Sequence, residues 1–122
     1  MKLQLEQPAG TNLVRASGPG QLRIGDRTLT TSVIVTATAL IAPWRPASVQ
    51  DLAPPDFEPL LALAPEVVLL GTGVRQQFPH AELLRILYQQ RMGIEVLDTS
   101  AACCTYNVLV TEGRNVAAAL IV

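Results

Sequence analysis

Four consecutive aliphatic residues, Val67 to Leu70, lie between Glu66 and the glycine turn Gly71-Thr72-Gly73. Four consecutive aliphatic residues leave no polar side for water, so we predict a strand that is covered on both faces, as central parallel strands are. Open α/β sheets bind ligands where such strands end. The pattern therefore predicts a central strand, with a candidate site at its carboxyl end.

The residues after this strand predict a helix and a second parallel strand. Pro79 and His80 begin a helix that we expect to reach Met92, with Gly93 as a left-handed cap. We expect its buried stripe to consist of Leu83, Leu84, Leu87 and Tyr88. Ile94 to Leu97 then returns as a strand, which predicts a right-handed parallel strand-helix-strand unit.

A second helix and a last strand complete this pattern. The helix is expected from Thr99 to about Thr111, with Asp98 or Thr99 as its N-cap and Gly113 as its terminator. The aliphatic segment 115–122 is expected to form the strand.

The N-terminal part alternates apolar and polar residues in short stretches separated by turn residues. We expect strands at Lys2 to Leu5, Leu13 to Ala16 and Leu22 to Ile24. Gly25-Asp26 then forms a two-residue hairpin loop before Arg27 to Leu29. The pattern predicts an additional N-terminal antiparallel β unit.

The next segment is β-branched and then rich in proline. Ser32 to Ile41 is apolar on both sides, so we predict one interior strand. The prolines that follow favour turns and short helical pieces, with one or two helical turns at Asp56 to Leu63. Trp44, the single tryptophan, is interpreted as a buried anchor of this loop rather than a surface for ligand stacking.

Length and charge narrow the choice of function. A chain of 122 residues with 49% hydrophobic residues fits a single domain, 1–122. The net charge of −1 predicts no binding to nucleic acid or to anionic membranes. No segment has the length and apolarity of a membrane span, and residues 1–8 resemble neither a secretory signal nor a mitochondrial presequence, so we expect a cytoplasmic protein.

The glycine turn is the first candidate for chemistry. Its amides, with Arg75 nearby, suggest a cradle for an anion or a small polar metabolite. The turn lacks the third glycine of a dinucleotide fingerprint and the ending of a P-loop. We favour tight geometry at the strand exit, which glycine alone explains.

The adjacent thiols Cys103 and Cys104 are the second candidate. Their spacing suits neither a disulfide framework nor a zinc site, so we expect them to be reduced. The helix N-terminus could activate one of them, with His80 as the single possible histidine base, but we favour packing for at least one thiol. The sequence predicts no catalytic residues, metal or cofactor.

Polar residues in and after the second helix form the last candidate group. Asn107 is unusual in a helix, and we expect it to bond a neighbouring loop, or the glycine turn, while Tyr106 packs. Glu112 and Arg114 flank Gly113 and are expected to form an exposed ion pair or the rim of a partner surface.

Three segments together resemble the domain family that includes mitochondrial complex I assembly factor 3: Glu-Val-Val-Leu-Leu-Gly-Thr-Gly at 66–73, Gly-Ile-Glu-Val-Leu-Asp-Thr at 93–99, and Thr-Tyr-Asn-Val-Leu at 105–109 with Glu-Gly-Arg-Asn-Val-Ala-Ala-Ala-Leu-Ile at 112–121. The resemblance implies an α/β fold of three layers, β+α/β/α, around a mixed sheet of about five strands. It also implies a protein that acts through contacts with other proteins and has no known catalytic reaction.

Two functions follow as expectations. The first is a non-enzymatic protein-interaction or assembly protein with an unknown protein partner. The alternative is a domain that binds a small molecule or an anion at the glycine turn. An enzyme is one form that this alternative includes. Candidate surface residues for either are Gly71, Thr72, Gly73, Arg75, Cys104, Tyr106, Asn107, Glu112 and Arg114. A homodimer formed through exposed strand edges is compatible with both.

Overall fold

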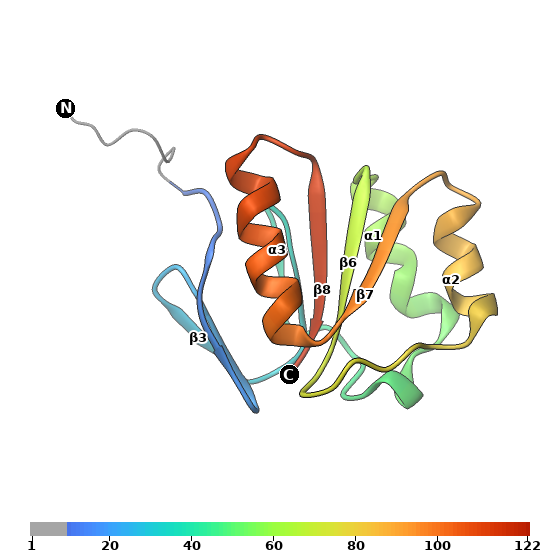
Figure 1. Ribbon diagram of the computed structural model, residues 1–122, viewed down its shortest axis with the longest axis horizontal. Helices are drawn as coiled ribbons and strands as arrows, with labels where there is room; N and C mark the ends of the chain where they lie inside the picture. Colours follow the sequence, from blue (N-terminus) through green and yellow to red (C-terminus); the bar gives the residue numbers. More distant parts are fainter. Residues whose placement is uncertain (1–9) are drawn as a thin grey trace.

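The structure is a computed structural model that describes residues 10–122, and it contains two sheets and three layers (Figure 1). The five-stranded sheet has the order β5-β4-β8-β6-β7, and a separate antiparallel sheet has the order β1-β2-β3. Their strands are β1 (Val14–Gly18), β2 (Gln21–Ile24), β3 (Arg27–Leu29), β4 (Val33–Val35), β5 (Leu40–Ile41), β6 (Val67–Thr72), β7 (Gly93–Leu97) and β8 (Val116–Ile121). The strand expected at Lys2 to Leu5 lies outside the described residues.

The two faces of the five-stranded sheet carry separate cores. Helices α1 (Glu58–Leu63) and α2 (Ala81–Tyr88) cover one face, where Val68 and Leu70 are buried. Helix α3 (Thr99–Thr111) and the three-stranded sheet cover the other face, where Leu69 is buried. This arrangement confirms the predicted three-layer β+α/β/α fold.

Strand β6 is the centre of this arrangement, as predicted. It pairs in parallel with β7 on one side and with β8 on the other. Val68, Leu69 and Leu70 are at most 1% exposed, because residues on both faces of the strand enter a core. Strand β8 is also buried throughout and pairs antiparallel with β4, which makes the sheet mixed.

The N-terminal antiparallel unit is confirmed for the described strands. Gly25 and Asp26 connect β2 to β3 as the expected two-residue loop, with Ile24 opposite Arg27. A bulge interrupts the β1–β2 pairing between Val14 and Ala16. The sheet packs on α3 through the buried side chains of Val14, Leu22, Ile24 and Leu29.

The single strand predicted at Ser32 to Ile41 is wrong, because the segment folds back as the β4–β5 hairpin. The hydroxyl of Thr36 accepts hydrogen bonds from the amides of Thr38 (3.3 Å) and Ala39 (3.0 Å), which turns the chain. The side-chain amide of Asn12 donates to the carbonyls of Thr36 (3.0 Å) and Ala39 (3.1 Å). A distant polar residue thus stabilises the turn that ends β4.

The helix predicted from Pro79 to Met92 is shorter, since α2 begins after its N-cap His80 and ends at Tyr88. The left-handed position is Arg91 (φ +62°), whereas Gly93 already belongs to β7 and donates its amide to the carbonyl of Glu66. Leu84 and Leu87 are buried as predicted, but Tyr88 is 56% exposed and is not part of the buried stripe.

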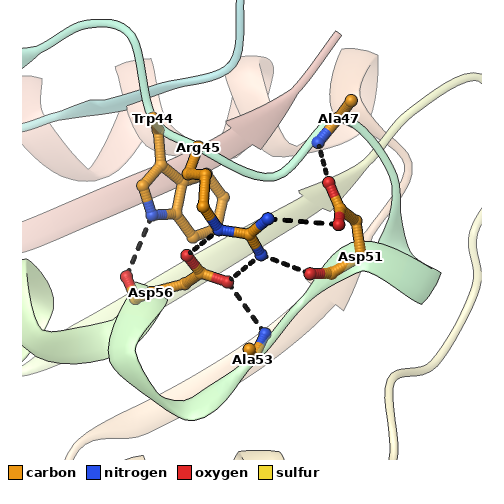
Figure 2. A network of polar contacts seen from close by, with 6 residues as sticks. All are labelled: Trp44, Arg45, Ala47, Asp51, Ala53 and Asp56. Carbon is orange, nitrogen blue, oxygen red and sulfur yellow. Dashed lines mark hydrogen bonds and ion pairs between the residues drawn. The ribbon is translucent and has the colours of Figure 1, made fainter.

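The proline-rich segment is held by polar contacts around Trp44 (Figure 2). This side chain is 4% exposed, and its Nε1 donates to the carbonyl of Asp56 (2.9 Å), so the anchor prediction is confirmed. Arg45 binds the Asp56 carboxylate through Nε–Oδ1 (2.8 Å) and Nη2–Oδ2 (2.6 Å). Arg45 also contacts the carboxylate and carbonyl of Asp51. Pro54–Phe57 forms a 3-10 turn that leads into α1.

Candidate functional site

A cavity of about 230 Å³ lies where β6 and β8 end and α3 begins. The tip of the β1–β2 hairpin forms its remaining wall. Its lining consists of Ser17, Gly18, Pro19, Gly73, Val74, Asp98, Thr99, Ser100, Ile121 and Val122. The position matches the general rule that α/β sheets place sites at the carboxyl ends of their strands.

Gly71 and Gly73 have different roles in this turn. A Cβ on Gly71 would lie 3.0 Å from Leu120 Cδ2 and 3.1 Å from Thr99 Cα, so α3 can approach the strand this closely only if residue 71 has no side chain. Gly73 has open space around it but takes φ +98°, which glycine adopts without strain.

Thr99 joins the strand ends to the helix. Its hydroxyl accepts the amide proton of Gly73 (2.7 Å) and donates to the carbonyl of Ile121 (2.5 Å). Its own amide donates to the carbonyl of Gly73 (2.9 Å). Asp98 caps α3 by accepting the amide proton of Ala101 (2.9 Å), as predicted.

These hydrogen bonds determine whether the amides of the glycine turn are free to bind an anion. The amide of Gly73 and two amides of the first turn of α3 already have partners within the protein, and Asp98 adds a carboxylate at the cavity. A carboxylate beside the positive end of a helix dipole stabilises the helix and repels an incoming anion. The geometry therefore favours the strand-exit interpretation of the two glycines over an anion cradle.

Thr72 shapes the loop that follows β6. Its hydroxyl donates to the carbonyl of Arg75 (2.7 Å), with the carbonyl of Leu97 at 3.1 Å, and accepts the amide proton of Gln77 (3.1 Å). This buried hydroxyl fixes a loop whose apolar side chains face solvent, since Val74 is 78% and Phe78 is 69% exposed. The side chain of Arg75 is exposed and does not line the cavity.

The adjacent cysteines face different surroundings. Cys103 is buried against the three-stranded sheet, and burial raises the pKa of its thiol to about 12. Such a thiol is protonated and unreactive at neutral pH. Cys104 is exposed on α3 and does not line the cavity, so packing holds for one of the two thiols, as expected.

Tyr106 and Asn107 attach α3 to the N-terminal sheet and not to the glycine turn. Tyr106 is fully buried, and its hydroxyl donates to the carbonyl of Asn12 (2.8 Å). Burial raises the pKa of this phenol above its usual range. Asn107 bonds both backbone groups of Val14, accepting from the amide (2.9 Å) and donating to the carbonyl (2.8 Å).

The pair expected between Glu112 and Arg114 is wrong. Arg114 instead contacts Glu66, with Nε–Oε1 at 3.0 Å, and the hydrogen bond from this guanidinium lowers the pKa of the Glu66 carboxyl. The pair links the start of β6 to the start of β8, at the opposite end of the strands from the cavity.

Of the candidate surface residues named from the sequence, only Gly73 lines the cavity, together with the predicted cap residues Asp98 and Thr99. The side chains of Thr72, Arg75, Cys104 and Asn107 do not converge on it. Sequence reasoning missed the hairpin tip, Ser17 to Pro19, which includes the turn between β1 and β2. Nothing local in the sequence places that turn beside α3.

Within residues 10–122 no group of three or more histidine, cysteine, aspartate or glutamate side chains is arranged to hold a metal ion. Among the helices of the same residues, none has the length and apolarity needed to cross a membrane.

Known proteins resemble this chain over almost its whole length. It is 34% identical over 121 residues to the mouse (Mus musculus) protein named NADH dehydrogenase [ubiquinone] 1 alpha subcomplex assembly factor 3. The match covers 98% of this chain and 64% of the mouse protein, so the chain spans just under two thirds of that relative.

Solved structures from bacteria share the fold. A solution structure of a Xanthomonas campestris protein is 39% identical, with a TM-score of 0.84, and the match covers 100% of this chain and 92% of that one. A crystal structure of a Bordetella parapertussis protein is 34% identical, with a TM-score of 0.85, covering 93% of this chain and 98% of that one.

Residues 14–121 match the family model described as protein of unknown function (DUF498/DUF598), and this match begins at β1 and ends at β8. The matched region contains both sheets, α3 and every residue that lines the cavity except Val122. The chain belongs to the DUF498/DUF598 family, with complex I assembly factor 3 of animals among its relatives.

Proposed function

We propose that this protein acts by binding other proteins, as an assembly-type factor without a reaction of its own. The recognition surface in this proposal is the loop after β6 together with the first turns of α3. One observation carries the choice of surface: Val74 and Phe78 expose large apolar side chains on a loop that the Thr72 hydroxyl fixes. Exposed apolar side chains that lie together mark contact sites, whereas single ones scattered over a surface do not.

The relatives support the class of function. The mouse relative is named as an assembly factor, and the match to it covers 98% of this chain. The match covers only 64% of the mouse protein. An assembly role for the present chain is therefore part of this proposal. A cytoplasmic location and pairing of two copies through strand edges belong to the same proposal; cell fractionation and sedimentation test them.

Affinity capture with quantitative mass spectrometry tests the recognition surface. The wild-type protein should recover a reproducible partner from extract of its source cell. The double variant Val74→Ser, Phe78→Ser should reduce recovery by about tenfold or more, because truncated apolar anchors cost most of the energy at such contacts.

Val108→Ser is the matched control, since Val108 is 56% exposed on α3 away from the loop. This control should retain the partner. Equal recovery by the double variant and the wild type, with both folded by circular dichroism, would reject the loop as the contact. Failure of the wild type to recover any partner would reject the protein-binding function.

A second candidate function is the binding of a small polar molecule, and the cavity itself favours it. The polar residues that line the cavity include Ser17, Ser100 and Asp98. This set suits a neutral or cationic molecule better than an anion. NMR titration with a panel of small amines, polyols and phosphate tests the idea: shifts confined to the amides of Ser17, Gly73 and Ser100 would support it, and unchanged amides would reject it.

A further inference from the structure

The outer face of the three-stranded sheet brings two arginines together. The bulge in β1 sets Arg15 and Ala16 opposite Arg23 of β2, and all three residues are exposed. Thr28 of β3 lies opposite Arg23 on its other side. The buried residues of the same strands, Val14 and Ile24, occupy the face that packs on α3.

A pair of like charges on adjacent strands destabilises a sheet unless an opposite charge lies nearby. Among the described residues, the ion pairs within 4.0 Å involve Arg45 and Arg114 and none involves Arg15 or Arg23. Neither guanidinium group is paired with a carboxylate of the described residues, so both are available to a partner.

The charge of the chain is also unevenly distributed. Residues 10–31 carry three arginines and one aspartate, whereas residues 32–122 carry five arginines and eight acidic residues. The third arginine of the sheet, Arg27, is exposed at the start of β3, where it lies opposite Ile24. The N-terminal sheet is thus a cationic surface on a molecule with a net charge of −1.

We propose that this outer face, centred on Arg15 and Arg23, binds an acidic segment of a protein partner. A guanidinium group forms two parallel hydrogen bonds with one carboxylate, so paired arginines suit successive glutamate or aspartate side chains. The surface carries too few positive charges, on a molecule that is acidic overall, for the long phosphate tracks of nucleic acid. The proposal concerns a surface separate from the loop after β6 and does not depend on it.

Fluorescence anisotropy with a labelled deca-glutamate peptide tests this surface on the full chain. We expect saturable binding that weakens several-fold when salt rises from about 0.05 M to about 0.2 M, because exposed charges are screened. The double variant Arg15→Gln, Arg23→Gln should weaken binding about tenfold, since it removes both bidentate contacts. NMR shifts should map to residues 14–29.

Arg85→Gln, Arg91→Gln is the matched control, since both arginines are exposed and the change in net charge is the same. The control variant should bind the peptide as the wild type does, and so should the double variant Val74→Ser, Phe78→Ser. The uncharged peptide deca-glutamine should not bind to the wild type. Equal weakening by both arginine pairs would reduce the effect to net charge and overturn the proposal. Tighter binding of a thymidine decanucleotide or of phosphatidylglycerol vesicles through Arg15 and Arg23 would also overturn it.

Discussion

Gly71 sets the distance between β6 and α3 by lacking a side chain. Its neighbours on that side are Leu120 of β8 and the backbone of Thr99, which cannot move without disturbing the cap of α3. The same contact brings the Thr99 hydroxyl within bonding distance of Gly73 and Ile121. Because residue 71 has no side chain, β6, β8 and α3 can lie in contact at the edge of the cavity.

Gly71→Ala should destabilise the protein by about 1–3 kcal/mol, because the new methyl group overpacks a backbone contact. Gly18→Ala is the control, since a Cβ at residue 18 meets no atom within 4 Å. Urea denaturation measures both variants, and we expect the control to stay within about 0.5 kcal/mol of wild type. Similar midpoints for the two alanine variants would contradict this account of residue 71.

Residue roles could be predicted where the signal is local and not where the partner is distant. Asp98 was recognisable as a cap, and Gly113 as a helix terminator, from their neighbours alone. Arg114 bonds Glu66, 48 residues away, and Asn107 bonds Val14, 93 residues away. Such partners depend on how the elements pack, which spacing along the chain does not encode.

At the scale of elements, the proline-rich segment is ordered by one buried carboxylate. The side chain of Asp56 is only 5% exposed. Its carboxylate accepts two hydrogen bonds from Arg45 and one from the amide of Ala53 (2.8 Å) (Figure 2). The hydrogen bond from Arg45 is the main reason that the pKa of Asp56 is lowered. This network connects the turn after Trp44 to the start of α1.

Asp56→Asn should lower the free energy of unfolding at pH 7 by about 1–3 kcal/mol, because buried donors lose their charged acceptor. Since the folded-state pKa of Asp56 is lowered, its contribution is complete above the unfolded value of about 3.9 and is lost as the pH falls through the folded value. Urea titrations between pH 7 and about pH 3 should therefore show wild type and variant converging only at the acid end.

Asp51→Asn is the comparison for this prediction, since Asp51 pairs with the same arginine but is 43% exposed. Its effect on the free energy of unfolding at pH 7 should be smaller than that of Asp56→Asn, because exposed ion pairs are screened by solvent. A constant difference between wild type and the Asp56 variant down to the lowest pH would show that the charge of this carboxyl does not stabilise the fold.

Elements with a continuous hydrophobic pattern were predictable, and elements set by long-range polar contacts were not. β6, β8 and α3 follow directly from their aliphatic runs and caps. The β4–β5 hairpin does not, because its strands have the composition of one strand and its turn depends on Asn12. The cavity depends in the same way on the position of the β1–β2 hairpin, so only its glycine turn and the start of α3 could be predicted from the sequence.

The whole molecule consists of a central sheet and a smaller sheet that attaches through α3. Besides the buried apolar residues, the attachment rests on Tyr106 and Asn107, which bond the backbone of Asn12 and Val14. The cavity and the surface centred on Arg15 and Arg23 both depend on it, since the tip of the β1–β2 hairpin forms one wall of the cavity and the hairpin itself carries the two arginines.

Asn107→Ala should lower the free energy of unfolding by about 1–3 kcal/mol, because two hydrogen bonds to the Val14 backbone are lost together. Hydrogen exchange should accelerate at the Val14 amide and in β2, while the amides of β6 keep their protection relative to global unfolding. Val108→Ala, one residue further along α3 and exposed, should leave exchange in the N-terminal sheet unchanged. Unaltered exchange at Val14 in the Asn107 variant would contradict this attachment.

The position of β8 between β4 and β6 has a consequence for protein synthesis. When β6 leaves the ribosome, the strand that will cover one of its edges, residues 116–121, has not yet been made. A nascent chain of this family therefore carries an uncovered apolar edge until its final strand emerges, and it completes its fold only after translation has passed that point.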